Sequence, residues 1–502
     1  MASGGLTAVV KRSWRRFRRR PAAIQVGALV VAVAVVGGVV YGLSASGSGK
    51  SSGTGSSAAA TGQSAGTGQV STSTRGVSAT AVNVAFPVSN LTTLATNFGF
   101  AGDAEYPRQA AAIRTYVNEL NAVGGINGRR INPIIVNYDP TNEAGMRALC
   151  KQWTEGSPAV FAVIDGIGAW TGDNELCVAQ EGHTPFIGEW STVTAWTNEG
   201  APYLWWTGAD QASILATVVA WGHSSGLLGG GRKVAVVTGD RTSDQVALNN
   251  YLLPDMQRAG LPRPVIETIP SSLTNTAAIN GAAPLIVQRL KAADVQSVIP
   301  LMPFNSFFPY LAQETSQHYF PKLLLSDYES SIEVTLGLIP VPYERALDGQ
   351  QGVTAETLGG VDAPENIAPT GGYNPGVTAC YQTWQAHNPP AAPTVSPYIE
   401  EQGPIVGWCQ AVRLFAAAAT KAGPDLNRRT FVEAMATIQG FPGTYSPVLS
   451  YGPDKFSGPT EYQVVELHNN VPPSPQCLLT WNGKPQGTCW VVIDSWKPLA
   501  AS

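Results

Sequence analysis

Apolar and polar positions alternate in a regular way along most of the chain. From Ala81 onward, short runs rich in Val and Ile are followed by longer stretches in which apolar residues recur at helical spacing. This alternation is typical of βαβ units and a parallel sheet. The first unit has a strand over 81–88, a helix that Asp103 can cap and that runs to residue 122, and a strand over 131–138.

Two blocks of this kind follow one another. The first continues with strands over 159–164, 185–188 and 203–206 and helices over 142–155 and 172–180. The second has strands over 233–238, 265–269, 295–301 and 323–326 and helices over 210–221, 243–258, 284–292 and 304–317. So many strands exceed one ordinary sheet, and we therefore expect two doubly wound α/β lobes. Two further helices, over 405–422 and 429–437, precede strand pairs that run through Val464 and Trp490.

An uncharged apolar stretch over residues 22–43 precedes this globular part. About 20 apolar residues cover the hydrocarbon layer of a bilayer, and the basic tail over 1–21 is expected to stay in the cytoplasm. We expect a retained transmembrane anchor, with a cleaved secretory signal as the alternative. No Cys follows the stretch closely, which excludes a lipid anchor of the lipoprotein type. Residues 44–78 are rich in Gly, Ser and Thr and predict a disordered linker.

Charge is distributed unevenly along the chain. Residues 1–21 hold seven basic residues and no acid, whereas the part from Gly76 onward holds 22 basic and 35 acidic residues, a net charge of −13. A nucleic-acid-binding domain needs an excess of Lys and Arg to replace counterions on phosphate. DNA and RNA are therefore not expected as partners. The five histidines have no metal-ligand spacing, so no metal is expected either.

Six cysteines follow the apolar stretch: Cys150, Cys177, Cys380, Cys409, Cys477 and Cys489. None has the C-x-x-C or Cys/His spacing of a metal site, so disulfides on the exported side of the membrane are expected. Many pairings are possible. Nearest-neighbour pairing is favoured because Cys477 and Cys489 bracket Asn482-Gly483, a dipeptide that favours a hairpin turn. The pairs Cys150–Cys177 and Cys380–Cys409 then follow by elimination.

Residues 123–131, with the sequence Val-Gly-Gly-Ile-Asn-Gly-Arg-Arg-Ile, follow a predicted helix. The two glycines stop the helix, and Asn127-Gly128 makes a tight turn before the next strand. This segment resembles the signature of type I periplasmic binding proteins, and more specifically of the branched-chain amino-acid (Leu/Ile/Val) binding proteins of ABC transporters. The resemblance extends over roughly residues 81–468 and includes Tyr138-Asp139-Pro140-Thr141-Asn142, Gly260, Trp408, Arg413 and Lys421.

The resemblance implies two lobes that are joined by a three-strand hinge and close over a solute like a flytrap. The first lobe would comprise residues 79–207 and 352–445, and the second residues 208–351 and 446–502. Solute contacts would come from two loops of the first lobe and from two strand ends of the second. Carried over position by position, these contacts are Gly168, Ala169, Trp170, Thr171, Glu189, Trp190, Ser191, Thr192, the stretch from Asp240 to Asp244, Asp327 and Tyr328.

The residues at these positions favour a solute with an amine or an aromatic ring. Ala169-Trp170 stands where members of the family present a small hydroxyl residue to a ligand carboxylate, and Glu189 would repel a carboxylate. Trp170, Trp190 and Tyr328 are suited to stacking on a flat, aromatic or cationic solute. Packing within a lobe is the structural alternative for each Trp.

These features predict a non-catalytic, extracytoplasmic solute-binding protein that is anchored in the cell membrane and delivers its solute to an ABC-transporter permease. A membrane-anchored ligand-sensing receptor of the same fold is the main alternative.

Two motifs suggest catalysis or a cofactor, but each stands in the wrong context. Gly222-His223-Ser224-Ser225-Gly226 fits the G-x-S-x-G motif of hydrolases, which needs a strand before the Ser and a helix after it; here a predicted helix precedes it. The glycines from Gly166 to Gly172 mimic a dinucleotide-binding loop, but they follow the third strand of their lobe instead of the first. An extracellular hydrolase is therefore the least favoured function, and no catalytic residue or cofactor is assigned.

Overall fold

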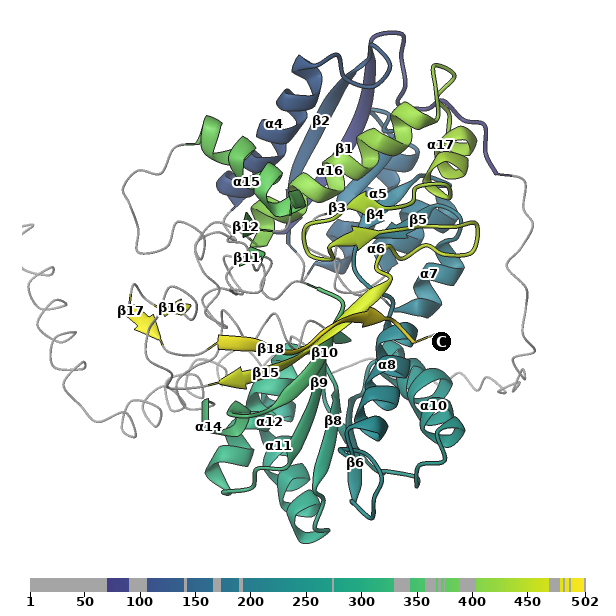
Figure 1. The fold of residues 1–502 in the computed structure, drawn as a ribbon. Helices are drawn as coiled ribbons and strands as arrows, with labels where there is room; N and C mark the ends of the chain where they lie inside the picture. Colours follow the sequence, from purple (N-terminus) through teal and green to yellow (C-terminus); the bar gives the residue numbers. More distant parts are fainter. Residues whose placement is uncertain are drawn as a thin grey trace, which may run out of the picture. The chain divides into compact units, whose positions relative to one another are not determined.

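The structure is a computed structural model that describes residues 70–89, 106–139, 142–165, 173–188, 193–272, 275–328, 344–356, 367–368, 372–373, 375–388, 403–468, 479–481, 484–486 and 489–500. These residues form two main β-sheets with helices packed on them (Figure 1). We call the first sheet with α4–α7 and α15–α17 the first lobe, and the second sheet with α8–α12 and α14 the second lobe.

The first sheet has five parallel strands in the order β2-β1-β3-β4-β5. They are β1 (Ala81–Ser89), β2 (Arg130–Tyr138), β3 (Ala162–Asp165), β4 (Phe186–Gly188) and β5 (Leu204–Trp206). β1 and β2 pair along their whole length, from Ala81 opposite Arg130 to Ser89 opposite Tyr138. This order is one of the common doubly wound arrangements, so the α/β prediction is confirmed for this part of the chain.

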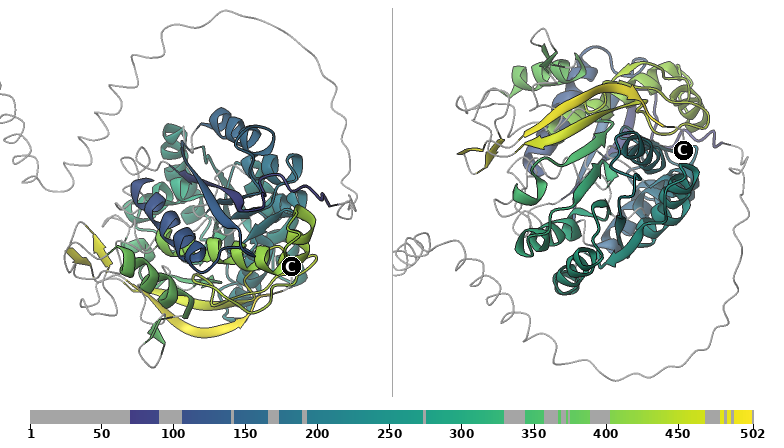
Figure 2. Two further views of the ribbon diagram at one scale, coloured as in Figure 1. Left: turned by 90° about the horizontal axis from the view of Figure 1, so that it is seen from above. Right: turned by 60° about the horizontal axis from the view of Figure 1, so that its bottom comes forward.

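The second sheet has seven strands in the order β18-β15-β10-β9-β8-β6-β7. They are β6 (Val234–Gly239), β7 (Val265–Ile269), β8 (Ser297–Leu301), β9 (Lys322–Ser326), β10 (Gln351–Thr354), β15 (Glu461–His468) and β18 (Cys489–Pro498). The strands β6 to β10 are parallel and repeat the order of the first sheet. β15 and β18 add two antiparallel strands, which Figure 2 shows as a long yellow ribbon.

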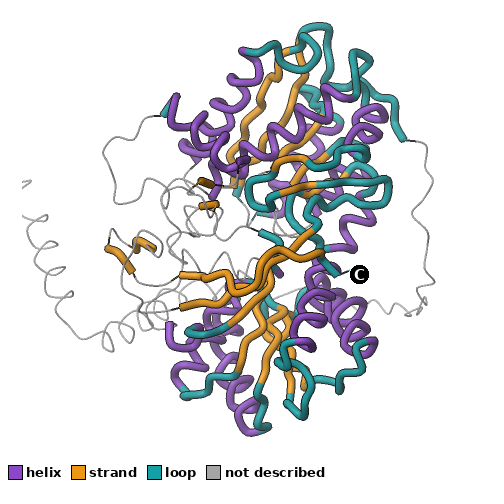
Figure 3. Tube along the Cα trace, in the orientation of Figure 1, coloured by secondary structure: helices purple, strands orange, loops and turns teal. Residues whose placement is uncertain are grey.

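Both faces of the second sheet are covered by helices. In β6, Val234 and Val236 belong to one hydrophobic cluster, and Ala235 and Val237 belong to another. Successive residues of a strand point to opposite faces, so the sheet separates two cores. Helices lie on both sides of the strands in Figure 3, and they are α8 (Gln211–Ser224) and α10 (Leu253–Arg258) at one core and α11 (Thr276–Ala292) and α12 (Phe304–Ser316) at the other.

The remaining elements are shorter or belong to the first lobe. The other helices are α4 (Tyr106–Ala122), α5 (Glu143–Thr154), α6 (Asp173–Leu176), the π-helical η2 (Cys177–Glu181), α7 (Thr194–Gly200), α9 (Thr242–Val246), the π-helical η3 (Ala247–Leu252), α14 (Glu344–Leu347), α15 (Pro375–His387), α16 (Gly403–Lys421) and α17 (Arg428–Met435). The short strand pairs are β11 (Ile367–Ala368) with β12 (Gly372–Tyr373), β13 (Phe441–Pro442) with β14 (Val448–Leu449), and β16 (Leu479–Trp481) with β17 (Lys484–Gln486).

The start of α11 differs from the prediction. Proline is common at the first position of a helix, and the predicted helix therefore begins at Pro284. In the structure α11 begins at Thr276 and Pro284 lies inside it. Asn275 caps the helix by accepting a hydrogen bond from the backbone N–H of Ala278 at 3.2 Å. The cap, and not the proline, sets the start of this helix.

Residues 70–78, which the prediction places in the disordered linker, pack on the first lobe. The backbone N–H of Asn83 donates to the Gly76 carbonyl at 2.8 Å, and that of Arg428 donates to the Ser73 carbonyl at 3.0 Å. Gly76 has φ +81°, and a Cβ there would lie 2.2 Å from the backbone N of Phe161. Only glycine fits this close approach. Residues 70–78 therefore belong to the folded part, because the backbone of this polar segment is paired with the lobe.

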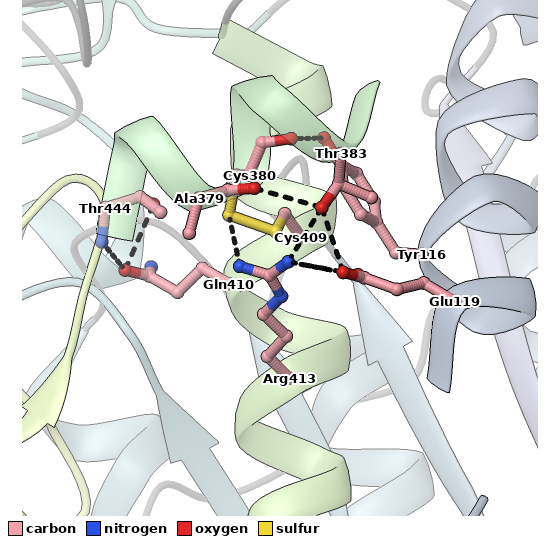
Figure 4. Close-up of a disulfide and its surroundings, with 9 residues drawn as sticks. All are labelled: Tyr116, Glu119, Ala379, Cys380, Thr383, Cys409, Gln410, Arg413 and Thr444. Carbon is pink, nitrogen blue, oxygen red and sulfur yellow. Dashed lines mark hydrogen bonds and ion pairs between the residues drawn. A yellow bond between two sulfur atoms is a disulfide. The ribbon is translucent and has the colours of Figure 1, made fainter. Parts of the chain in front are cut away.

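Two of the three predicted disulfides are confirmed. The Cα atoms of Cys150 and Cys177 lie 6.1 Å apart, and their bridge joins α5 to η2. The bridge from Cys380 to Cys409, with Cα atoms 5.8 Å apart, joins α15 to α16. Figure 4 shows the second bridge beside Arg413, which contacts Cys380 Sγ at 3.6 Å.

The third predicted disulfide, Cys477–Cys489, lies outside the described side chains. The hairpin that was predicted between these cysteines is confirmed, because β16 and β17 are antiparallel and Trp481 pairs with Lys484.

Within the described part of the chain, no helix is both long enough and apolar enough to cross a membrane. The predicted basic tail over 1–21, the predicted anchor over 22–43 and the linker up to residue 69 lie outside the described residues.

Three described segments lead from one sheet toward the other. The first runs from β5 into α8, the second leaves β10, and the third runs from β14 into β15. The predicted lobe boundary before Gly352 falls inside β10, which pairs with β9 and β15 of the second sheet. The chain therefore leaves the second sheet only after Thr354. β10 was not predicted because its four residues include a polar side chain at each end and a glycine.

Candidate functional site

The five parallel strands of each sheet have the same order, and in both sheets the order reverses at the same position. In doubly wound folds, ligands bind beyond the carboxyl ends of the strands at this switch point. The switch point lies between β1 and β3 in the first sheet and between β6 and β8 in the second. The side chains that follow these strands and their neighbours therefore form the candidate site.

The second-lobe part of the site is built around Asp244, whose side chain is buried. Arg241 donates from Nε to Asp244 Oδ2 at 2.9 Å and from Nη2 to Oδ1 at 2.7 Å. Such bidentate, charge-assisted pairs are strong and fix the guanidinium plane. Tyr328 donates its hydroxyl to Asp244 Oδ1 at 2.6 Å. We call Arg241, Asp244 and Tyr328 the Asp244 cluster.

Local sequence explains how Asp244 reaches this position. Gly239 is the last residue of β6, and a Cβ there would lie 2.1 Å from Asp244 Oδ2. α9 begins at Thr242 and places Asp244 in its first turn, where the helix dipole favours a carboxylate. The absence of a side chain at Gly239 and the start of α9 therefore both position Asp244.

In the Asp244 cluster, the basic side chain is more exposed than the acidic side chain. The Asp244 side chain is fully buried, whereas the side chain of Arg241 is 27% exposed. The Tyr328 ring is also buried and packs in the core that α8 and α10 cover. The Arg241 side chain is thus the part of the cluster that reaches the surface of the lobe.

Asp240 lies next to the Asp244 cluster but bonds elsewhere. Its Oδ1 accepts hydrogen bonds from the backbone N–H of Ser271 at 2.9 Å and from the Ser271 hydroxyl at 2.6 Å. The backbone N–H of Asp240 donates to the same hydroxyl at 3.1 Å. These bonds join the ends of β6 and β7 and leave Asp240 exposed. Its carboxylate therefore combines a structural role with access to solvent.

Asp327 holds the second crossover. Its side chain is buried, and Oδ2 accepts a hydrogen bond from the backbone N–H of Ala355 at 2.7 Å. Ala355 is the first residue after β10. Asp327 therefore joins the end of β9 to the point at which the chain leaves the second sheet.

The first-lobe part of the site contains a buried pair of hydroxyl groups. Ser89 donates to the Tyr138 hydroxyl at 2.7 Å, and the two residues end β1 and β2. The two predicted contact loops of this lobe follow β3 and β4 directly. Their residues, Gly168, Ala169, Trp170 and Thr171 in one loop and Glu189, Trp190, Ser191 and Thr192 in the other, lie outside the described residues.

Sequence reasoning included Arg241 only as part of the stretch from Asp240 to Asp244, and it did not single out Gly239 or Ser89. Arg241 and Asp244 have the i, i+3 spacing that brings side chains together on a helix, and this spacing could have identified the pair. A glycine or serine at the end of a buried strand is a weaker signal. The pairing of Tyr328 with Asp244 has no local signal, because 84 positions separate the two residues.

Two alternative kinds of site find no support in the described residues. Among those residues, no group of three or more His, Cys, Asp and Glu side chains could hold a metal ion. The G-x-S-x-G segment lies where α8 ends at Ser224, and Gly226 follows with φ +74°. This is the predicted helix end and turn. A nucleophile elbow needs a strand before the Ser.

Hydrogen bonds connect the three crossovers to one another. Tyr451 donates to the Trp206 carbonyl at 3.0 Å, and Ser457 donates to the Gly208 carbonyl at 2.8 Å, which links the third crossover to the first. Gln463 donates to the Glu356 carbonyl at 3.1 Å, which links the third to the second. The crossovers therefore form one bonded unit, as expected for a hinge.

The comparisons with known proteins agree with this architecture. A family model described as periplasmic binding protein matches residues 94–470. The chain therefore belongs to the periplasmic binding protein family, as the resemblance predicted. A search of curated proteins finds no match.

Several solved structures share the fold. They include a fatty acid ABC transporter substrate-binding protein from Thermomonospora curvata, with TM-score 0.57, 15% identity, and coverage of 84% of this chain and 93% of that chain. A solute-binding protein from Rhodopseudomonas palustris BisB5 in complex with 3,4-dihydroxybenzoic acid has TM-score 0.57, 14% identity, and coverage of 84% and 98%. A branched-chain amino acid ABC transporter protein from Thermus thermophilus with bound valine has TM-score 0.55, 12% identity, and coverage of 84% and 97%.

Proposed function

We propose that this chain is the extracytoplasmic solute-binding protein of an ABC importer and that it does not catalyse a reaction. The observation that carries the proposal is the repeated strand order: two sheets with the same switch point, each with polar side chains at the strand ends, are joined by three crossovers. This is the geometry of a protein whose lobes close on a solute. Membership of the family supports it.

We propose a small amino-acid-like or aromatic solute. Arg241 offers a guanidinium that is held rigidly by Asp244, and a guanidinium binds a carboxylate in a bidentate manner. Asp240 is exposed at the same strand end and suits an amine. Related structures bind valine and 3,4-dihydroxybenzoic acid, both of which carry a carboxylate. The tryptophans Trp170 and Trp190 remain the proposed stacking partners of an aromatic ring.

A thermal-shift screen tests the binding part of the proposal. The panel contains amino acids, amines and polyamines, hydroxybenzoates and fatty acids at matched pH. A ligand that binds only the folded state raises the melting temperature as its concentration rises. We expect a shift from one or more amino acids or aromatic acids, and none from simple alkyl amines. Isothermal titration with the best solute then gives its Kd. A panel that produces no shift contradicts the proposal.

Two further measurements separate the remaining claims. The best solute is incubated with the protein and followed by NMR; unchanged solute supports the non-enzyme claim, and any product overturns it. Uptake of labelled solute into membrane vesicles that contain the permease encoded by a neighbouring gene tests whether the protein delivers the solute to that permease. Solute that binds without stimulated uptake would contradict the importer claim and favour a sensing receptor.

We also propose that residues 22–43 remain attached as a membrane anchor. Their length, the basic residues before them and the linker after them support this reading. Mass spectrometry of the protein from membranes gives its N-terminus. A mature chain that begins after residue 43 would show that the segment is a cleaved signal.

A further inference from the structure

We propose that Lys455 is a positioning residue of the hinge: its ammonium group holds the third crossover in a closed loop that is bonded to the first crossover, and so sets the geometry in which the lobes close. This inference rests on the proposed solute-binding function and concerns the regulation of the same site.

Backbone carbonyls of its own loop surround the ammonium group of Lys455. Nζ lies 2.6 Å from the carbonyl oxygen of Ser450 and 3.0 Å from those of Gly458 and Pro459, and it also donates to the carbonyl of Ser457. An ammonium group has three hydrogens, so four carbonyls share them. One side chain thus joins the beginning of the 450–459 loop to its end.

Two of these carbonyls, those of Ser457 and Gly458, belong to residues that bond to the first crossover. The backbone N–H of Gly458 donates to the Trp206 carbonyl at 3.0 Å, and the backbone N–H of Trp206 donates to the Phe456 carbonyl at 2.8 Å. Ser457 donates its hydroxyl to the Gly208 carbonyl at 2.8 Å. Lys455 therefore orients the same peptide groups that connect the two crossovers.

Aromatic packing on the first lobe reinforces this connection but does not replace it. The Trp205 ring lies 4.8 Å from the Phe456 ring and 5.8 Å from the Tyr451 ring, measured between centroids. These contacts fix one end of the loop. The segment from Ser457 to Pro459, which leads toward β15, has three carbonyls that accept from Lys455, and the Gly458 carbonyl also accepts from the backbone N–H of Ser450 at 2.8 Å. The ammonium group is thus placed where the chain passes from the first lobe to the second.

Lys455 carries a charge at neutral pH. Burial lowers the pKa of its ammonium group to about 8, and the carboxylate of Asp210, the N-cap of α8, acts in the opposite direction. The Tyr451 ring, 6.0 Å from Nζ, is the other group that faces it. Lys455 as a whole residue is exposed, so it can be replaced without opening a hydrophobic core. Measurements at pH 7 therefore examine the protonated form.

Hydrogen exchange of the full chain without solute gives a direct test. In Lys455→Met, we expect the amides of Trp206 and Gly458 to exchange at least about tenfold faster, since the carbonyls that orient the loop lose their donor. The amides of β6 should not change. Lys421→Met is the matched control, because Lys421 donates to a single carbonyl, that of Thr437, on the first lobe. Unchanged exchange at Trp206 and Gly458 would overturn the proposal.

Solute affinity gives the second readout. We expect Lys455→Met to weaken binding of the solute found for the wild type by about fivefold or more, while Lys421→Met binds like the wild type. If the wild type binds no solute in the panel, the proposed function fails, and the exchange experiment still decides the role of Lys455. If the wild type and Lys455→Met bind equally, the proposal for Lys455 fails alone.

Chemical rescue distinguishes an oxygen cage for a cation from simple packing. In Lys455→Ala, ammonium or methylammonium chloride should slow exchange at Trp206 and Gly458 toward the wild-type rate. Tetramethylammonium chloride at the same ionic strength cannot donate hydrogen bonds and should have no effect. Rescue by both salts, or by neither, contradicts the proposal. If Lys455→Met does not fold, the folded fraction of Lys455→Ala is measured in each salt instead. An increase with ammonium but not with tetramethylammonium supports the proposal, and any other result contradicts it.

Discussion

Tyr328 donates its hydroxyl to Asp244 Oδ1 at 2.6 Å, and this bond joins the carboxyl ends of β9 and β6 across the intervening strand β8. The same carboxylate receives Arg241 in a bidentate pair. A phenol that is buried in the core thus fixes a carboxylate, and the carboxylate fixes a partly exposed guanidinium. Arg241, which we propose as a solute contact, is therefore oriented by residues that are buried within the lobe.

Tyr328→Phe should weaken solute binding more than it weakens the fold. The variant removes one hydrogen bond to a charged acceptor, which contributes about 1.5–3 kcal/mol to stability, and frees the Asp244 cluster to move. We expect the affinity for the solute to fall by about tenfold, measured by calorimetry.

Tyr319→Phe is the matched control for Tyr328→Phe. Its hydroxyl donates to the Val295 carbonyl at 2.8 Å in the same lobe, away from the Asp244 cluster. We expect this variant to lose stability while its affinity for the solute stays at the wild-type value. Equal affinity losses in the two variants would mean that Tyr328 acts only through overall stability.

Arg241→Gln should destabilise the second lobe strongly. Asp244 is fully buried, so removal of Arg241 leaves a carboxylate without its main compensating charge. Breaking a buried ion pair from one side costs about 3–5 kcal/mol, and the partial exposure of Arg241 places the expected loss near the lower end. Denaturant unfolding measures this loss of stability.

Arg289→Gln is the control for Arg241→Gln. It removes a more exposed pair with Glu267 and should lower the free energy of unfolding by less than about 1 kcal/mol.

The central strands of the second sheet could be predicted from the sequence because they are buried on both faces. β6 has six buried residues in succession, and such a run predicts a strand without any knowledge of the neighbouring strands. β10 and α7 could not be found in this way. β10 is four residues long, and α7 contains Thr, Asn and Gly, which are weak helix formers. Both elements are defined by contacts with the rest of the lobe.

For the candidate site, the placement of the described residues at strand ends could be predicted, but their hydrogen bonds could not. Residues at strand ends follow from the fold, so Asp244, Asp327 and Tyr328 were expected there. The bonds of Tyr328 to Asp244 and of Asp327 to Ala355 were not expected, because they join residues that are 84 and 28 positions apart in the chain. Asp327 holds the backbone of Ala355, and Asp240 holds Ser271. A carboxylate that the sequence suggests as a solute contact can thus form its hydrogen bonds with other residues of the protein instead.

Gly239→Ala should disturb the Asp244 cluster. The added Cβ would lie 2.1 Å from Asp244 Oδ2 and 3.0 Å from Ser271 Oγ, so the carboxylate must move. We expect a loss of stability of about 1–3 kcal/mol, as for other overpacking substitutions, together with weaker solute binding. Urea unfolding and calorimetry measure the two effects.

Gly281→Ala gives the opposite expectation for the same chemical change. Gly281 lies within α11, and a Cβ there meets no atom within 4 Å. Alanine is a better helix former than glycine, so this variant should gain about 0.5–1 kcal/mol. If both variants shift stability in the same direction, the close approach at Gly239 does not control the site.

The disulfides should contribute comparable stability to the first lobe. They close loops with sequence separations of 27 and 29 residues, and the loop-entropy model gives about 3.5 kcal/mol for loops of this size. We expect Cys150→Ala/Cys177→Ala and Cys380→Ala/Cys409→Ala to lose similar amounts in urea unfolding. In the second variant, the Thr383 hydroxyl of α15 still donates to Glu119 at 2.9 Å and accepts from Arg413 at 3.1 Å, so α15 should remain helical by hydrogen exchange. Fast exchange throughout α15 would show that only the bridge holds it.

Glu314 should make the stability of the second lobe depend on pH. Its side chain is fully buried on α12, and burial raises the pKa of its carboxyl well above the ordinary value, while the neighbouring Tyr310 hydroxyl lowers it to a smaller extent. The unfolded chain loses this proton above about pH 4.3, whereas the folded chain keeps it. The folded state then binds more protons, so the free energy of unfolding decreases as pH rises from this value toward the raised pKa.

Glu314→Gln replaces the carboxyl with a neutral amide and should remove this dependence. Between pH 5 and pH 7.5 we expect the wild type to lose up to about 1.4 kcal/mol per pH unit more than the variant, which is the limit for one proton. Denaturant unfolding at several pH values measures the difference. Glu433→Gln, a change at an exposed side chain of α17, should follow the wild type. A Glu314→Gln profile parallel to the wild type would mean that Glu314 ionises in the folded state as it does in the unfolded chain.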